Sequence, residues 1–380
     1  MHFLYSCFVI FMLVYIILGE FQLAASKRLC LFSLSVAVLF MGFTSDIPDE
    51  IAYMQFYNNA YLYSWEDIFY PLEAIAKGLP SDYGFSTMNY IFYSLGSSYF
   101  VYKLCLVFFT IYTIYKYSAI ASYSMLIVCL YMIYPWFYDV IQVRSALMAL
   151  CICNAFFSYS FSEKHRMLKY IVWIVVGTLF HKSGIVFLLF VLICKGWNNP
   201  VGRKLIMLSS GVVSLLPLYA NVVKERWQDV AFMLQAQDGY AELSRYTERI
   251  VNNGYLIGYI VIMLSLLLLV FLQRSASDIK IQEYINNGKL MFISMTYIFP
   301  IFPLFMDASL RYPRAVMLIL YILIALYCKN VQQKKYKWIA LFCGLLIVMS
   351  FREMSLYSSV IQDAYNAVLE HNIIFHMVME

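Results

Sequence analysis

The sequence is poor in charged residues. Asp, Glu, Lys and Arg make up 13% of its 380 residues, whereas a soluble domain carries about 25%. Apolar and aromatic residues make up 63%, and the mean hydropathy is +0.72. This composition excludes a soluble enzyme, a disordered chain, a coiled coil and a small disulfide-rich scaffold. It predicts an all-α fold, that of a polytopic helical integral membrane protein.

Several motifs that carry catalytic chemistry are also absent. The chain has no Walker A sequence, no Gly-x-Gly-x-x-Gly and no His-Glu-x-x-His. ATP hydrolysis and zinc proteolysis are therefore disfavoured as functions. The sequence also lacks a cluster of metal-ligating residues, so we expect no metal site and no other cofactor.

The nine cysteines all lie within apolar runs, and none belongs to a pair placed in a loop. Such a distribution matches neither a disulfide framework nor a zinc site. Cys151 and Cys153 are two residues apart, so on a helix they do not face each other. We interpret all nine as small hydrophobic residues buried in the membrane.

The apolar runs predict about twelve transmembrane segments, within a range of 10–14. A spanning helix needs about 20 apolar residues, and fewer where protein surrounds it. The first run contains no Lys or Arg, so it is a poor signal peptide and is expected to stay attached. With no internal repeat or linker, residues 1–380 are expected to form a single membrane domain. The predicted spans are 2–18, 29–43, 98–115, 119–136, 143–161, 170–180, 184–194, 205–222, 255–272, 290–305, 312–327 and 337–350.

The distribution of charge along the sequence predicts how the chain is oriented across the membrane. One set of connecting loops carries 16 of the 27 basic residues but only four of the 22 acidic residues, a net charge of +12. Basic loops stay in the cytoplasm, so both termini are expected on the opposite side. That outer side then carries loop 44–97 with an interfacial helix at 86–97, a second loop at 223–254, and a tail at 351–380.

The short spans 170–180 and 184–194 are separated only by His181, Lys182 and Ser183. Each run would extend about 16 Å as a helix, and short interrupted segments indicate binding sites in membrane proteins. The ordinary pKa of histidine, about 6.5, makes His181 a candidate base at neutral pH. Alternatively, His181 makes structural hydrogen bonds in a tight turn.

A few cations lie close to the membrane in short outer turns, where charge is costly and is usually retained for function. Arg144 begins the span 143–161, and Arg311 and Arg314 begin the span 312–327. The complete set is Arg144, Lys182, Arg311 and Arg314.

Arginine is unfavourable at a helix N-terminus, because that end carries partial positive charge. A phosphate would favour this arrangement, since the helix end offers N–H donors and the guanidinium offers a bidentate fork. Two alternatives stay open. These arginines would bind lipid headgroups, or they would form local ion pairs with Asp139 and Asp307.

Asp49, Tyr53 and Tyr57 are spaced by four residues, which places them on one face of a helix. A carboxylate and two phenols would suit a sugar site, and Asp49 is the second candidate base. The alternative is that Asp49 and its acidic neighbours only stabilise the N-terminus of a solvated helix.

These features together resemble the Wzy/EpsG-type polysaccharide polymerases, which make bacterial O-antigen and exopolysaccharide. The resemblance extends from about residue 40 to residue 330 and rests on four segments. They are SDIPDEIAYMQFY after the second span, VRSALMAL opening a span, GTLFHKSGIVFLL in the short pair, and SLRYPRAVMLIL late in the chain.

The resemblance implies a GT-C-like, metal-independent glycosyltransferase at the periplasmic face of the inner membrane. It would join oligosaccharide repeat units carried on undecaprenyl diphosphate. Its partners would be this lipid-linked glycan, the bilayer and a separate chain-length regulator, with no nucleic acid. His181, Arg144 and Asp49 are the predicted catalytic residues. The predicted ligands of the lipid diphosphate or sugar are Arg311, Arg314, Lys182, Tyr53 and Tyr57.

Two other functions stay open. An O-antigen ligase would also need cations and a base at the outer face. A flippase or other polysaccharide transporter would carry no chemistry and would place its cations along a central path. The predicted position of the cations at the outer rim argues against transport.

Overall fold

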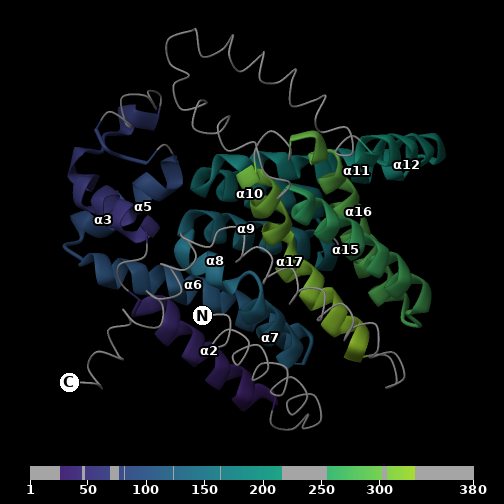
Figure 1. The fold of residues 1–380 in the computed structure, drawn as a ribbon, viewed down its shortest axis with the longest axis horizontal. Helices are drawn as coiled ribbons and strands as arrows, with labels where there is room; N and C mark the ends of the chain where they lie inside the picture. The colour runs from purple at the N-terminus through teal and green to yellow at the C-terminus, as the bar shows by residue number, and fades with distance from the viewer. Residues whose placement is uncertain are drawn as a thin grey trace. The chain divides into compact units, whose positions relative to one another are not determined.

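The computed structural model describes residues 26–44, 48–68, 77–80, 82–122, 124–162, 164–215, 255–301 and 306–329 (Figure 1). These residues form helices joined by turns, with no β-strand among them, so the predicted all-α class is confirmed for this part of the chain. Four predicted segments lie outside the described residues: spans 2–18 and 337–350, loop 223–254 and tail 351–380.

Helices of very different length follow one another along the chain. The α-helices are α2 (Ser26–Gly42), α3 (Pro48–Asn58), α5 (Tyr83–Ser94), α6 (Tyr99–Ile120), α7 (Met125–Ile133), α8 (Trp136–Ile141), α9 (Val143–Phe161), α10 (Arg166–Phe180), α11 (Leu189–Trp197), α12 (Pro200–Leu215), α15 (Tyr255–Ser275), α16 (Ile279–Thr296) and α17 (Met306–Lys329). Short 3₁₀ helices are η2 (Asn59–Leu62), η3 (Trp65–Ile68), η4 (Lys182–Leu188) and η6 (Phe299–Ile301).

Three of the described helices are long and apolar enough to cross a membrane: Val143–Phe161, Gly258–Ser275 and Arg311–Lys329. They coincide with three of the predicted spans. The total of twelve spans stays a prediction.

The predicted span 119–136 does not form one helix. α6 continues to Ile120 and is followed by Ser122, whose φ of 57° is incompatible with helix. The next helix, α7, has nine residues and ends before Tyr134, which is extended (φ −164°, ψ 126°). Tyr134 precedes Pro135, and the proline ring disfavours helical conformation in the residue before it.

Two further helices begin earlier than their apolar runs suggested. α16 begins at Ile279 rather than near 290, because the Asp278 carboxylate caps it by accepting hydrogen bonds from the N–H groups of Lys280 and Ile281. α17 begins at Met306, so Arg311 and Arg314 lie inside this helix. The helix dipole acts within the first turn, so its predicted effect on these two arginines was wrong.

The chain divides into two compact units, residues 1–185 with 324–380, and residues 186–323. In the first unit α9 packs along α10, α2 packs against α6 and α7, and α5 packs against α10 and α3 (Figure 1). α5 covers most of the segment 86–97, for which an interfacial helix was predicted; its position at the membrane stays a prediction.

In the second unit α15 packs along α16, and α11 packs against both α12 and α16. Hydroxyl pairs join α12 to the end of α16. Ser209 Oγ lies 2.7 Å from the Tyr297 hydroxyl, and Ser210 Oγ lies 3.1 Å from Thr296 Oγ1. These bonds satisfy polar groups inside an apolar unit, where unpaired ones would be costly.

Candidate functional site

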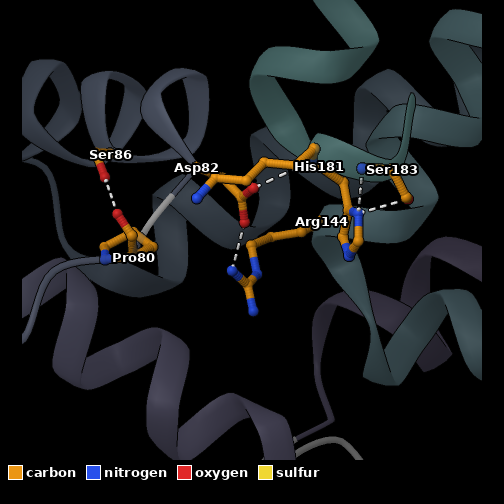
Figure 2. Close-up of polar contacts among 7 residues, drawn as sticks. Pro80, Asp82, Ser86, Arg144, His181 and Ser183 are labelled. Atoms are coloured by element: carbon orange, nitrogen blue, oxygen red, sulfur yellow. Dashed lines mark hydrogen bonds and ion pairs between the residues drawn. The ribbon is translucent and has the colours of Figure 1, made fainter. Parts of the chain in front are cut away.

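An ion pair joins Arg144 to Asp82 in the first unit. Arg144 Nη1 lies 2.6 Å from Asp82 Oδ2 (Figure 2). Arg144 is the second residue of α9, as predicted, and its Cζ lies 5.7 Å and 5.9 Å from the ring centres of Tyr53 and Phe56. Its buried Nε–H has no hydrogen-bond partner within the described residues. A buried unsatisfied donor costs about 1–3 kcal/mol, so this N–H suits a ligand oxygen.

Asp82 was not predicted as a site residue. It precedes α5, where an aspartate ordinarily caps the helix, yet its side chain makes no capping hydrogen bond. Oδ2 instead accepts from Arg144, and Oδ1 accepts from the backbone N–H of Lys182 at 3.2 Å. Asp82 thereby links the start of α9 to the turn after α10. The alternative predicted for Arg144, a local ion pair, is present, but its partner is Asp82 rather than Asp139.

A glycine allows α5 to approach α10 closely enough for these contacts. A Cβ added to Gly84 would lie 2.8 Å from the Cβ of Leu179 and 3.0 Å from its backbone. Leu179 lies two residues before His181, so the contact brings Asp82 beside the predicted catalytic turn.

The turn after α10 holds His181 in a defined orientation. The His181 N–H donates to the Gly177 carbonyl at 3.0 Å, and its own carbonyl accepts from the Gly184 N–H at 2.9 Å. The Ser183 N–H donates to Nδ1 at 3.3 Å, and the Ser183 hydroxyl lies 2.7 Å from the same nitrogen (Figure 2). Because a backbone N–H only donates, this contact assigns Nδ1 as an accepting nitrogen and the ring hydrogen to Nε2.

Asp82, Arg144, His181 and Ser183 thus form one polar cluster, drawn from the start of α5, the start of α9 and the turn after α10 (Figure 2). It combines a guanidinium, a basic ring nitrogen and a carboxylate. A fixed cation stabilises a developing anion, and a basic nitrogen accepts a proton. Within the described residues, no three His, Cys, Asp or Glu side chains are grouped so that they would hold a metal ion.

Comparison with protein-family models matches residues 27–371 to the EpsG family. The chain belongs to the EpsG family. The predicted resemblance is therefore confirmed. Neither curated proteins nor solved structures give a match. Membership of the EpsG family, together with the apolar helices, indicates a membrane protein with a polymerase-type role in polysaccharide biosynthesis.

In this EpsG-family chain the two predicted tyrosines differ in environment. Tyr53 faces the guanidinium of Arg144. Tyr57 is 3% exposed, its hydroxyl donates to the Ser97 carbonyl at 2.6 Å, and its ring stacks on Tyr102 with 5.2 Å between centres. Burial and the neighbouring Tyr93 hydroxyl raise the pKa of Tyr57. Tyr57 therefore packs α3 against α6, and its sugar-binding role stays a prediction.

Asp49 lies in the first turn of α3, next to a second ion pair that was not predicted. Glu50 Oε1 lies 2.5 Å from Lys103 Nζ, and this ammonium also donates to the Thr44 carbonyl. Glu50 and Lys103 are both buried, at 7% and 6% exposure. The pair fixes α3 to α6, and the role of Asp49 as a base stays a prediction.

The remaining predicted ligands are Lys182, Arg311 and Arg314. Lys182 is exposed and contributes its backbone N–H to Asp82. Arg311 and Arg314 belong to the second unit, where Arg314 is 6% exposed. The grouping of Arg311 and Arg314 with Arg144 around one diphosphate stays a prediction.

Proposed function

We propose that this protein is a membrane glycosyltransferase that polymerises oligosaccharide repeat units carried on undecaprenyl diphosphate. The observation that carries the proposal is the buried Nε–H of Arg144, which lies beside the His181 turn at the start of a membrane-length helix. About twelve spans, a GT-C-like arrangement, an inner-membrane location and a site facing the periplasm belong to the same proposal.

Arg144 acts on the departing lipid diphosphate. Cleavage of the sugar–phosphate bond leaves the electron pair, and hence negative charge, on a phosphate oxygen. A cation held at this point stabilises the transition state more than the ground state. Asp82 accepts from Nη1 and Tyr53 also interacts with the guanidinium, so a phosphate would use the remaining N–H donors, the buried Nε–H among them.

Asp82 is a positioning residue in this scheme. Its carboxylate holds both the Arg144 guanidinium and the backbone of Lys182, the residue after His181. The cation and the base therefore keep a fixed separation, which favours a reaction between two large bound substrates.

His181 is the base, and Nδ1 is its proton-accepting nitrogen. The acceptor sugar hydroxyl reaches Nδ1 by replacing the Ser183 hydroxyl, gives up its proton there and forms the new glycosidic bond. Asp49 is the alternative base. Lys182, Arg311 and Arg314 assist the diphosphate, and Tyr53 contributes a ring surface for a sugar.

The glycan profile of a deletion strain, resolved by chain length on a gel, tests the function. A polymerase deletion leaves surface glycan with a single repeat unit and no ladder, and the His181→Ala protein fails to restore the ladder at normal protein level. Polymer that accumulates on its carrier without attachment would indicate a ligase. Absence of any unit from the outer face would indicate a transporter, and both outcomes contradict the proposal.

A further inference from the structure

Two pairs of helices in the second unit meet around Trp197. α11 ends at Trp197 and turns at once into α12, because Gly202 packs directly against the carbonyl of Gly196. α15 ends at Ser275 and is followed by α16, which packs against both α11 and α12. Basic side chains from α12, α15 and α16 gather at this point.

Trp197 contacts two of these cations. Arg203 Cζ lies 5.6 Å from the centre of the Trp197 rings, and its Nε–H donates to the Trp197 carbonyl at 3.4 Å. Lys289 Nζ lies 5.4 Å from the same centre. It also donates to Gln273 Oε1 at 2.8 Å, so its ammonium is held rather than extended into solvent. Cation–π contacts and this hydrogen bond therefore fix the cations in place.

Among the residues that the structure describes, no carboxylate pairs with the positive charges of this group. Burial lowers the pKa of Lys289, and the charges of Arg203 and Arg274 lower it further. Asp278 is the acidic residue between α15 and α16, but its carboxylate caps α16. Arg203, Arg274 and Lys289 form no ion pair within the described residues. Arg203 and Lys289 are held against Trp197, and Arg274 lies close enough for its charge to act on Lys289, so an anion would stabilise the group.

The position of Arg274 indicates which anion. Arg274 lies in the last turn of the candidate span Gly258–Ser275, which places the group at the depth of lipid headgroups. Tryptophan is enriched at that depth. Leu267 on α15 and Leu192 on α11 are 61% and 64% exposed, as residues facing acyl chains would be.

We propose that Trp197, Arg203, Arg274 and Lys289 bind the phosphate of an anionic phospholipid headgroup, on the side predicted to face the cytoplasm. Arginine offers a planar fork to a phosphate diester, and the held ammonium of Lys289 adds a point charge. The site lies in the second unit and involves no residue of the proposed reaction, so it does not depend on the proposed function.

Thermal unfolding of the purified full chain in neutral detergent tests the site. The unfolding midpoint is measured against rising dioctanoyl-phosphatidylglycerol, dioctanoyl-phosphatidylcholine or inorganic phosphate. We expect a saturable rise with phosphatidylglycerol alone. The Arg203→Gln and Arg274→Gln variants change exposed side chains, and each should weaken the apparent affinity about fivefold, the contribution of one basic residue at a membrane surface.

Lys280→Gln is the matched control, because Lys280 is an exposed cation in the first turn of α16 outside the group. It should leave the affinity for phosphatidylglycerol unchanged.

Equal weakening in Lys280→Gln and Arg203→Gln would mean diffuse attraction by net charge and would overturn the site. An equal response to inorganic phosphate, lost in Arg203→Gln, would overturn the lipid assignment and leave a site for soluble phosphates. A response to phosphatidylcholine as strong as that to phosphatidylglycerol would overturn the role of the cations.

Discussion

Asp82 and Arg144 are 62 residues apart in the sequence, yet their side chains form a 2.6 Å ion pair. The Asp82 side chain is the buried partner at 6% exposure, whereas the Arg144 side chain is 27% exposed. The Arg144 side chain therefore keeps more exposed surface than its partner, although its Nε is buried. Removing a partner from a buried pair is costly, because the other charge stays uncompensated. This asymmetry is what a phosphate site needs, since the ligand approaches the exposed partner.

Arg144 should be sensitive even to a change that preserves its charge. Arg144→Lys keeps a cation beside Asp82 but removes the planar fork. We expect chain growth to fall about 10-fold to 100-fold, and Arg144→Ala to lower it by at least about 100-fold, as for loss of one transition-state donor. The gel ladder of the complemented deletion strain measures the effect at matched protein level. Arg28→Lys, at an exposed residue of α2, is the control and should grow a normal ladder. A normal ladder from Arg144→Lys would leave Arg144 with a structural role only.

Ser183 should be dispensable for proton transfer although it touches the proposed base. If the acceptor hydroxyl replaces Ser183 Oγ at His181 Nδ1, Ser183→Ala removes only the group that is displaced. We expect Ser183→Ala to retain the ladder and His181→Ala to lose it. The two variants are compared by ladder length in the same strain. Loss of the ladder in Ser183→Ala would indicate instead that the proton passes through the serine hydroxyl.

The sequence was sufficient for features that depend on local pattern, and it failed for pairings across the fold. The largely apolar run at 143–161 predicted α9 residue for residue, and its one basic residue is Arg144. Asp82 was missed because an aspartate before a helix is the usual pattern of an N-cap, and nothing local indicates that its carboxylate is directed elsewhere.

Glu50 and Lys103 were missed for a similar reason. Each lies near the end of a helix, where a charge is expected to reach solvent, and only the packing of α3 on α6 buries both. The start of α17 was misplaced because charged residues extend that helix beyond its apolar run. Patterns of hydropathy detect membrane helices, but they do not reveal which charges meet.

The Glu50–Lys103 pair should matter for stability. Lys103→Met leaves the buried Glu50 carboxylate without its cation, and such a loss costs about 3–5 kcal/mol. We expect a lower midpoint of thermal unfolding in detergent. Because two apolar residues of similar volume restore a balanced interior, the double variant Lys103→Met with Glu50→Met should recover most of the loss. Lys204→Met, at an exposed residue, is the control and should unfold normally. Additive effects of the two buried substitutions would contradict a direct pair.

Acid should loosen the segment around Asp67. Burial acts to raise the pKa of this carboxyl, but hydrogen bonds from Lys77 and Ser64 outweigh it, and the pKa is lowered from 3.8. A carboxylate with a depressed pKa stabilises the fold above its unfolded pKa, and this contribution is lost as the pH falls through the folded value. We expect faster hydrogen exchange at the Ser64 amide below about pH 4 than at neutral pH, after correction for intrinsic exchange. In the Asp67→Asn variant, the Ser64 amide should exchange fast at both acidic and neutral pH. Equal protection of the wild-type Ser64 amide at acidic and neutral pH would contradict this role of the Asp67 carboxylate.

Gly84 should be required for the geometry of the site as well as for packing. An added Cβ would lie 2.8 Å from the Cβ of Leu179, so Gly84→Ala forces α5 away from α10 and moves Asp82. We expect a loss of about 1–3 kcal/mol in stability, as for overpacking, together with a shortened glycan ladder.

Gly211→Ala is the matched control for this change. Gly211 also lies in a helix, but an added Cβ there meets nothing within 4 Å, so alanine should stabilise the helix by about 0.5–1 kcal/mol. Because the clash at Gly84 is with the Cβ and backbone of Leu179, truncation by Leu179→Ala should not rescue Gly84→Ala. Rescue by Leu179→Ala would show that the Leu179 atoms beyond Cβ exclude a side chain at position 84. The close approach of α5 and α10 would then not be the cause. A normal unfolding midpoint with a normal ladder in Gly84→Ala would contradict the contact itself.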